Sequence, residues 1–289
     1  MEFMQKTENL PVVRYTSESQ IRNPGFLLRS MVADIVFSRE LSWRLFVRDL
    51  NAQYRQSLFG VLWAFIPPIV TSVIFIVLNN QNVINFGDVG IPYPAYVLIG
   101  TILWQIFSES LNAPLKSVTA AQSLLAKVNF PREALIVSAF YLTVFNSLIK
   151  SVVIVAVILI FHLTPGWGII FAPLFILMLI LLGIMLGLLI TPIGTLYTDV
   201  ATAIPIVVQL AFFFTPVVYP PPQTFPFSLL AILNPVSPLL IAARDLLTTG
   251  ILSNPIAATV ISILTLLGLL VAWVIYRVSM PILIERMSS

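Results

Sequence analysis

The sequence predicts an all-α integral membrane protein with six transmembrane helices. Two features of the composition indicate this class: 58% of the residues are hydrophobic and only 9% are charged. The mean hydropathy of +0.99 agrees with them, whereas a soluble chain would carry roughly 25% charged residues. We therefore expect most of the 289 residues to lie in lipid, with an N-terminal amphipathic interface helix before the first span and two short re-entrant helices on the outer side.

An amphipathic segment leads into the first predicted span without a linker. Its apolar residues recur at helical spacing and form one stripe, made of Trp43, Phe46, Val47, Leu50 and Tyr54. Arginines lie off this stripe, at Arg44, Arg48 and Arg55. Such a pattern is typical of a helix in the headgroup layer, with its cationic side towards anionic phosphates. We therefore assign residues 1–56 to a cytoplasmic tail with this interface helix and residues 57–289 to the transmembrane domain.

Six stretches approach the ~20 apolar residues that a membrane-crossing helix needs. They are residues 59–78, 93–112, 134–161, 168–195, 203–219 and 255–276. Lys and Arg gather before the first stretch, between the second and third, and after the sixth, and neither occurs in the first or third loop. The positive-inside rule then places both termini in the cytoplasm, although the short loop around Asp199 carries no positive charge. Residues 1–20 are polar, so we expect insertion through internal spans and no signal peptide.

The segment 220–254 does not fit a simple loop. It is rich in proline, which blocks continuous helix, and it contains the apolar runs SLLAIL and PLLIAA, each too short to cross a bilayer. We expect two short re-entrant helices, and an ordinary outer loop packed on the spans is the alternative. Arg244 and Asp245 fall on the second of these helices, where they either pair with each other or mark the outer mouth.

Two groups inside the spans could act on a cargo. Lys150 is costly within a bilayer, so it either contacts an anionic substrate group along a conduit or snorkels to the interface, and both interpretations remain open. Glu109 is expected near the cytoplasmic end of its span, as an interfacial residue. The second group is an aromatic cluster whose rings could stack on the apolar faces of sugars or could simply pack against lipid: Phe212, Phe213, Phe214 and Tyr219.

The sequence excludes several classes of site. It has no cysteine and a single histidine, His162, so neither a thiolate site nor a histidine-cluster metal site can form. It also has no G-x-x-x-x-G-K-[ST] string, so energy must come from a partner protein or an ion gradient. None of the predicted spans has an acidic residue at its centre, which disfavours a gradient-driven carrier and a membrane-embedded enzyme.

Three strings resemble the membrane subunit of polysaccharide-exporting ABC transporters, the type-two permeases of O-antigen, teichoic-acid and capsule export. The strings are RDLNAQYRQSLFGVLWAFIPP at 48–68, VNFPREAL at 128–135 and LNPVSPLLIAARDLLTTG at 233–250. The first matches the family pattern at Arg48, Asp49, Tyr54, Gln56, Ser57, Gly60, Trp63 and Pro67, and departs from it at Gln53 and at residues 66–68. The resemblance runs from about residue 40 to the end of the chain.

The resemblance implies a homodimer of six-span subunits in the bacterial cytoplasmic (inner) membrane. A separately encoded ATPase would bind to each subunit and would hold the ATP and Mg, so this chain would be no enzyme and would carry no cofactor. A cytoplasmic coupling helix is implied at about 117–128. The residues implied in coupling are Ser117, Gln122, Lys127, Asn129, Phe130, Arg132 and Glu133. The proline of F-P-R-E would end that helix and aim the next span.

The implied cargo is a lipid-linked polysaccharide that enters from the inner leaflet. The entry gate would comprise Arg48, Tyr54, Arg55, Gln56 and Trp63. We expect Arg48 and Arg55 to meet the diphosphate of the cargo; binding of ordinary anionic lipid or of the partner protein is the alternative. A type-two permease for a drug or another lipid is the nearest rival function, and a membrane-bound glycan-modifying enzyme is the rival from another class.

Overall fold

The computed structural model describes residues 24–55, 59–84, 89–125, 127–128, 130–222, 224–225, 228 and 233–288. Within these ranges the regular elements are all helical, so the predicted all-α class is confirmed. In chain order they are α1 (Pro24–Phe37), α2 (Arg39–Tyr54), η2 (Gly60–Ala64), α3 (Ile66–Asn80), α4 (Tyr93–Ala120), α5 (Gln122–Leu125), α6 (Glu133–Ile160), η3 (Trp167–Phe171), α7 (Ala172–Leu196), α8 (Thr198–Phe214), α10 (Val236–Thr248) and α11 (Pro255–Ser288).

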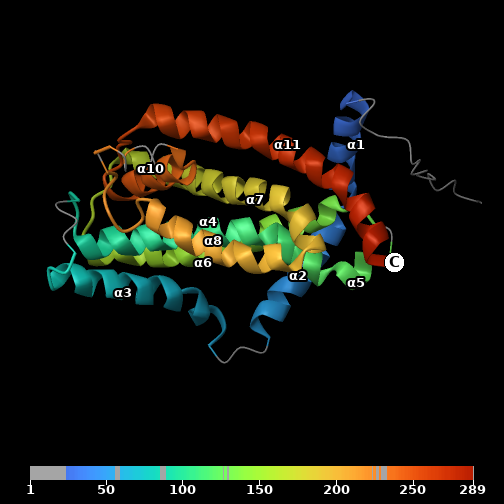
Figure 1. Ribbon diagram of the computed structural model, residues 1–289. Helices are drawn as coiled ribbons and strands as arrows, with labels where there is room; N and C mark the ends of the chain where they lie inside the picture. The colour runs from blue at the N-terminus through green and yellow to red at the C-terminus, as the bar shows by residue number, and fades with distance from the viewer. Residues whose placement is uncertain are drawn as a thin grey trace, which may run out of the picture.

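The long helices run side by side as one bundle (Figure 1). α4, α6, α7 and α8 form its body, α11 lies on one flank and α3 on the opposite flank. α1, α5 and the C-terminus lie at one end, which we name the α5 end, and α10 lies at the other, the α10 end. Three described stretches are long and apolar enough to cross a membrane, namely Glu133–Ile160, Trp167–Leu196 and Pro255–Pro281. The count of six spans therefore stays a prediction.

α4 and α7 pack closely at the centre of the bundle because α7 has glycines where the two backbones meet. A Cβ atom at Gly183 would lie only 2.5 Å from the Cβ of Ser110, and one at Gly187 would clash with the carbonyl of Leu111. This G-x-x-x-G spacing puts both glycines on one face of α7, and small residues there let membrane helices approach. α4 is consequently the most enclosed helix, and its residues Ala95, Val97, Ile99, Leu103 and Ile106 are fully buried.

α2 packs against α6 as well as facing outward. The Phe46 ring lies 6.1 Å from the rings of Tyr141 and Phe145, and Leu45 is buried beside it. Trp43 belongs to the predicted apolar stripe, yet 57% of it is exposed. The stripe therefore faces α6 through Phe46, and Trp43 lies at its exposed edge with its ring centre 6.3 Å from that of Tyr141.

Several predicted boundaries differ from the observed ones at the α5 end, where α11 runs on to Ser288, beyond the predicted end at 276. α4 continues to Ala120, beyond the predicted end at 112, so the segment 117–128 begins inside the last turn of α4. The chain turns at Ala121, and α5 then covers only Gln122–Leu125. Of the two predicted re-entrant helices, the second coincides with α10, whereas most of the first lies outside the described residues.

Candidate functional site

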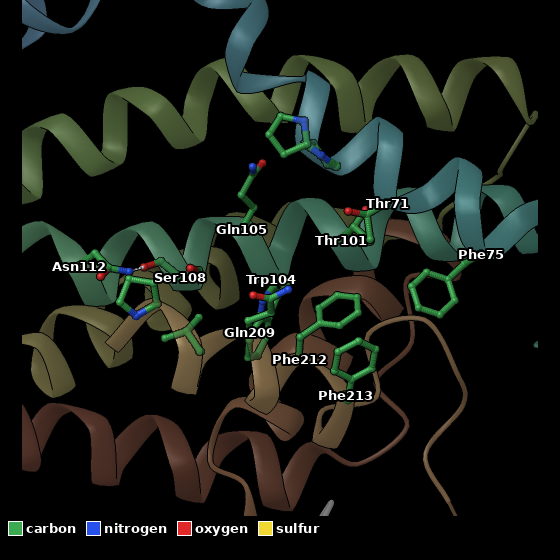
Figure 2. A pocket seen from close by; sticks show the side chains of 14 residues that line it. Thr71, Phe75, Thr101, Trp104, Gln105, Ser108, Asn112, Gln209, Phe212 and Phe213 are labelled. Carbon is green, nitrogen blue, oxygen red and sulfur yellow. Dashed lines mark hydrogen bonds between the residues drawn. The ribbon is translucent and has the colours of Figure 1, made fainter. Parts of the chain in front are cut away.

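A cleft of about 350 Å³ lies between α3, α4 and α8, and we name it the central cleft. Figure 2 shows aromatic rings and polar side chains facing into it from all three helices. Its lining consists of Pro67, Pro68, Thr71, Phe75, Thr101, Trp104, Gln105, Ser108, Asn112, Pro205, Val208, Gln209, Phe212 and Phe213. Rings beside hydroxyl and amide groups can both stack on a ligand and hydrogen-bond to it.

Phe212 is the centre of the aromatic part of this lining. Its ring lies 6.1 Å from Phe75, 5.9 Å from Trp104 and 5.4 Å from Phe213. The sequence predicted Phe212 and Phe213 as channel candidates, and both line the central cleft. The other three predicted channel candidates, Lys150, Phe214 and Tyr219, are not among its lining side chains.

Polar groups within the central cleft were missed by the sequence reasoning. Gln105 and Gln209 each interrupt an apolar run within their helix, ILW-Q-IF in α4 and PIVV-Q-LAFFF in α8, and that interruption was the available signal. The Oε1 atom of Gln105 is buried without a hydrogen-bond partner among the described residues. α3 is fixed beside these groups because Ser72 and Thr101 share a hydrogen bond of 2.9 Å.

A second cleft, of about 650 Å³, opens between α2, η2 and α6, and we name it the lateral cleft. It is lined by Leu50, Asn51, Tyr54, Arg55, Val61 and Phe145. Of the predicted gate residues, Tyr54 and Arg55 meet here. Arg48 pairs with Asp49 at 2.7 Å outside this lining, Trp63 contacts Phe59 with ring centres 5.8 Å apart, and Gln56 lies outside the described residues.

A polar cluster lies beside the lateral cleft. The Tyr54 hydroxyl donates a hydrogen bond of 3.2 Å to Asn146 Oδ1, and burial, together with the negative charge of Glu109, raises the pKa of Tyr54. One turn along α6, Lys150 forms an ion pair with Glu109 of α4. The Lys150 side chain is 1% exposed, so in this structure it does not snorkel to a surface. Glu109 is likewise not at the end of its helix, since α4 runs on to Ala120.

The predicted coupling residues divide into inward and outward groups. Ser117 is buried and donates a hydrogen bond of 3.1 Å to the Leu135 carbonyl, and the carbonyl of Arg132 accepts one of 3.4 Å from Tyr276. Gln122 and Phe130 are half-buried, whereas Lys127 is exposed. Asn129 lies outside the described residues.

Glu133 faces the interior of the subunit. Its buried carboxylate forms an ion pair with Arg277 of α11. Arg277 also pairs with Asp34 of α1 at 2.7 Å and donates a hydrogen bond of 3.2 Å to Ser30. Three segments far apart in the sequence are therefore joined at the α5 end, and Glu133 is already engaged within its own chain.

At the α10 end, Arg244 and Asp245 have separate partners. Arg244 is 3% exposed, its guanidinium lies 3.7 Å from the centre of the Tyr96 ring, and its Nη1 donates a hydrogen bond of 3.0 Å to the Val217 carbonyl. Asp245 Oδ2 accepts a hydrogen bond of 2.9 Å from the backbone N–H of Ser253. Arg244 thus lies inside the protein, not at an open mouth.

The family model described as ABC-2 type transporter matches residues 40–248. The matched range contains both clefts, the polar cluster and the strings around Arg48, Glu133 and Arg244. The chain belongs to the ABC-2 type transporter family. As an ABC-2 type transporter it is a multi-pass membrane protein and a transport subunit, and the central cleft is its candidate site for cargo.

Relatives within this family carry a more specific name. The chain is 27% identical, over 194 residues, to the O-antigen export system permease protein RfbA of Myxococcus xanthus, which covers 66% of this chain and 72% of the relative. It is 25% identical, over 214 residues, to the protein of the same name from Klebsiella pneumoniae, which covers 71% of this chain and 79% of that protein. Both alignments take in most of each relative.

Proposed function

We propose that this chain is the permease subunit of an ATP-driven exporter that moves a lipid-linked polysaccharide, such as an O-antigen-like glycan, across the cytoplasmic membrane. The observation that carries the proposal is the central cleft, which combines a cluster of rings around Phe212 with the amides of Gln105, Asn112 and Gln209. Sugars offer apolar faces for stacking and hydroxyl groups for hydrogen bonds. The names of the relatives support the same substrate class.

The lateral cleft supplies a candidate entry for the lipid-linked end of the cargo. Arg55 is exposed beside Tyr54 in its lining, and a guanidinium binds phosphate oxygens through two parallel hydrogen bonds. The α5 end would then face the cytoplasm, in agreement with the predicted topology. Ordinary anionic lipid at Arg55 is the alternative occupant.

A second copy of the chain would complete the central cleft. α3 and α8 flank this cleft, and both carry exposed apolar residues: Ile69, Val70, Val73, Ile74 and Val77 on α3, and Ile206, Val207 and Leu210 on α8. Symmetric homodimers are the commonest oligomers. Cysteine cross-linking at V73C, in a chain that has no native cysteine, would test this dimer.

The partner ATPase would bind at the α5 end, where it would supply ATP and Mg. Lys127 is a predicted coupling residue that is exposed there, shortly after α5. We expect K127E to weaken co-purification with the ATPase, and K116E, another exposed lysine nearer the bundle, to serve as its matched control. Equal retention of the ATPase by both variants would count against this docking place.

Replacement of adjacent phenylalanines tests the proposed cargo path. Phe213 and Phe214 are similarly exposed, at 57% and 55%, yet only Phe213 is among the lining residues of the central cleft. We expect F213A to lower export of the lipid-linked glycan about tenfold, because the stacking of a sugar on an aromatic ring is worth about 1 kcal/mol or more. F214A should leave export near the wild-type rate. Equal export by both variants, with normal amounts of assembled transporter, would exclude this path.

A matched arginine pair tests the entry. Arg55 lines the lateral cleft, whereas Arg48 pairs with Asp49 outside it. R55A should lower export more than R48A does. Unchanged export by R55A, with normal assembly, would remove the substrate role and leave lipid binding. A drug or other lipid that stimulates the ATPase better than a lipid-linked glycan does would favour the rival permease function.

A further inference from the structure

Residues 215–219 leave helical geometry directly after α8, and we name them the strap. Val217 and Val218 of the strap are almost completely buried, at 0% and 2% exposure. Irregular backbone inside a membrane protein persists only where its polar groups find partners. The strap therefore needs hydrogen-bond donors from elsewhere in the chain.

Three successive carbonyl groups of the strap each accept a hydrogen bond from a different side chain. The Val217 carbonyl accepts from Arg244 Nη1 at 3.0 Å, the Val218 carbonyl from the Tyr93 hydroxyl at 3.1 Å, and the Tyr219 carbonyl from the Tyr96 hydroxyl at 2.9 Å. α4 supplies two of these donors and α10 supplies the third. We name these three donors the carbonyl clamp.

The clamp residues also support one another. The Arg244 guanidinium stacks over the Tyr96 ring at 3.7 Å, and no carboxylate lies within ion-pair distance of Arg244 in the described part of the chain. A buried cation is costly in a membrane unless it has partners, and here a ring face and a carbonyl oxygen are those partners.

The helix α4 is shaped to receive the strap. A Cβ atom at Gly100 would overlap the Val217 carbonyl oxygen and would lie 3.3 Å from Arg244 Nη1. Tyr93, Tyr96 and Gly100 are three and four residues apart, so they share one face of α4. That face binds the strap through the hydroxyl groups of Tyr93 and Tyr96, and the absence of a side chain at Gly100 lets the backbone of the strap approach.

The strap is joined to the aromatic part of the central cleft. It continues directly from Phe212 and Phe213, and the hydroxyl of Tyr219 donates a hydrogen bond of 2.8 Å to the Phe213 carbonyl. The Thr215 hydroxyl donates one of 2.7 Å to the Ala211 carbonyl. A shift of the strap would therefore be passed to the end of α8 that carries both lining rings.

We propose that Arg244, Tyr96 and Tyr93 are positioning residues that hold the strap against α4 and thereby fix the end of α8 that carries Phe212 and Phe213 in the cargo path. They act on the strap and not on the cargo, and release of the three carbonyls frees that end of α8. Each hydrogen bond contributes modestly, so the strap can detach in steps. The cargo path itself rests on the proposed function, whereas the clamp on the strap does not.

Thiol labelling of the strap tests the clamp without any cargo. The chain has no native cysteine, so V218C gives a single thiol on the strap. The assembled transporter is placed in nanodiscs, which leave both faces accessible, and the rate of labelling by a small hydrophilic maleimide is measured. Because Val218 is buried, we expect slow labelling in the V218C background.

Loss of a clamp donor should speed this labelling. We expect Y96F, which keeps the ring under Arg244 and removes only the hydroxyl, to raise the rate about fivefold, as the loss of one hydrogen bond implies. R244M should raise it further, and Y276F, which removes a hydroxyl hydrogen bond to a carbonyl at the opposite, α5 end, should leave it unchanged. Size-exclusion profiles confirm that each variant assembles.

The labelling result separates the clamp from the proposed function. Unchanged rates in both Y96F and R244M would overturn the clamp, even if the glycan were exported. Faster labelling together with no export of any lipid-linked glycan by the unmodified transporter would uphold the clamp and overturn the proposed cargo. If R244M fails to assemble, the Y96F and Y93F rates decide the question.

Discussion

Each end of the bundle is held together by one arginine, and the two arginines have different kinds of partner. Arg244 at the α10 end contacts a ring and a backbone carbonyl. Arg277 at the α5 end contacts two carboxylates, Asp34 and Glu133. Each joins three segments, because Arg244 connects α10 to α4 and the strap, and Arg277 connects α11 to α1 and the start of α6.

The kind of partner determines how firmly each end is held together. At the α5 end, loss of the guanidinium would leave two carboxylates close together, and Glu133 is buried, so the penalty is that of unpaired buried charge. At the α10 end, loss of Arg244 would leave one carbonyl and one ring face without a partner, and both are neutral. The ion pairs of Arg277 therefore secure the α5 end more firmly than the ring and carbonyl contacts of Arg244 secure the α10 end.

The largest effect is expected for R277M. This change leaves Glu133 and Asp34 unpaired, which should lower the free energy of unfolding by about 3 kcal/mol. Thermal unfolding of the detergent-solubilised protein measures it. The double variant R277M/E133Q should recover part of the loss, because the buried charge is removed with its partner. A double variant no more stable than R277M would contradict this account of the α5 end.

R244M should have the next largest effect, about 2 kcal/mol, from the loss of the stacked cation and one hydrogen bond. The same unfolding measurement compares it directly with R277M. R244K keeps the positive charge but loses the planar group that stacks and donates at once, so we expect it to resemble R244M. A loss larger than that of R277M would reverse the comparison between the two ends.

Each end also has a tyrosine whose hydroxyl donates to a carbonyl, and these bonds differ in length. Tyr96 donates to the Tyr219 carbonyl at 2.9 Å, whereas Tyr276 donates to the Arg132 carbonyl at 3.4 Å. Y96F should cost about 1 kcal/mol of unfolding free energy, and Y276F less, because a long hydrogen bond is weaker. Equal costs would show that the hydroxyl bonds do not distinguish the ends.

The smallest expected effect is that of added salt on the stability lost when each arginine is replaced. A quarter of the Asp34 side chain is exposed, so added salt partly screens its pair with Arg277. The stability difference between wild type and R277M should shrink by a few tenths of a kcal/mol between about 0.1 M and 1 M salt. The stability difference between wild type and R244M should stay constant. An equal salt dependence for both variants would contradict the assignment of ion pairs to the α5 end alone.

Much of this organisation follows from local sequence, and the rest depends on partners that only the fold selects. Low charge content and apolar runs predicted the all-α class, and the ring cluster at Phe212 and Phe213 was visible as a motif. The sequence flagged Lys150, but its pairing with Glu109 joins two separate helices, which no spacing rule connects. Arg277 was counted only as a positive charge after the last span.

One feature of the sequence could have predicted a close helix contact, but the predictions did not include it. The spacing of Gly183 and Gly187 is a known device of close helix contact, and it marks the face of α7 that meets α4. The roles of Tyr93 and Tyr96 could not be predicted, because nothing in the sequence says where a hydroxyl donates. Their acceptors lie more than 120 residues away along the chain.

The strap is held through its main chain, and this has a consequence for which mutations the protein can accept. The clamp donates hydrogen bonds to carbonyl oxygens, which every residue has. Residues 217 and 218 therefore need only to be small enough and apolar enough to fit their buried positions. Gly100, Tyr96 and Arg244 have no such freedom. A saturation library over the α10 end should therefore accept small apolar residues at 217 and 218 and reject most substitutions at 96, 100 and 244.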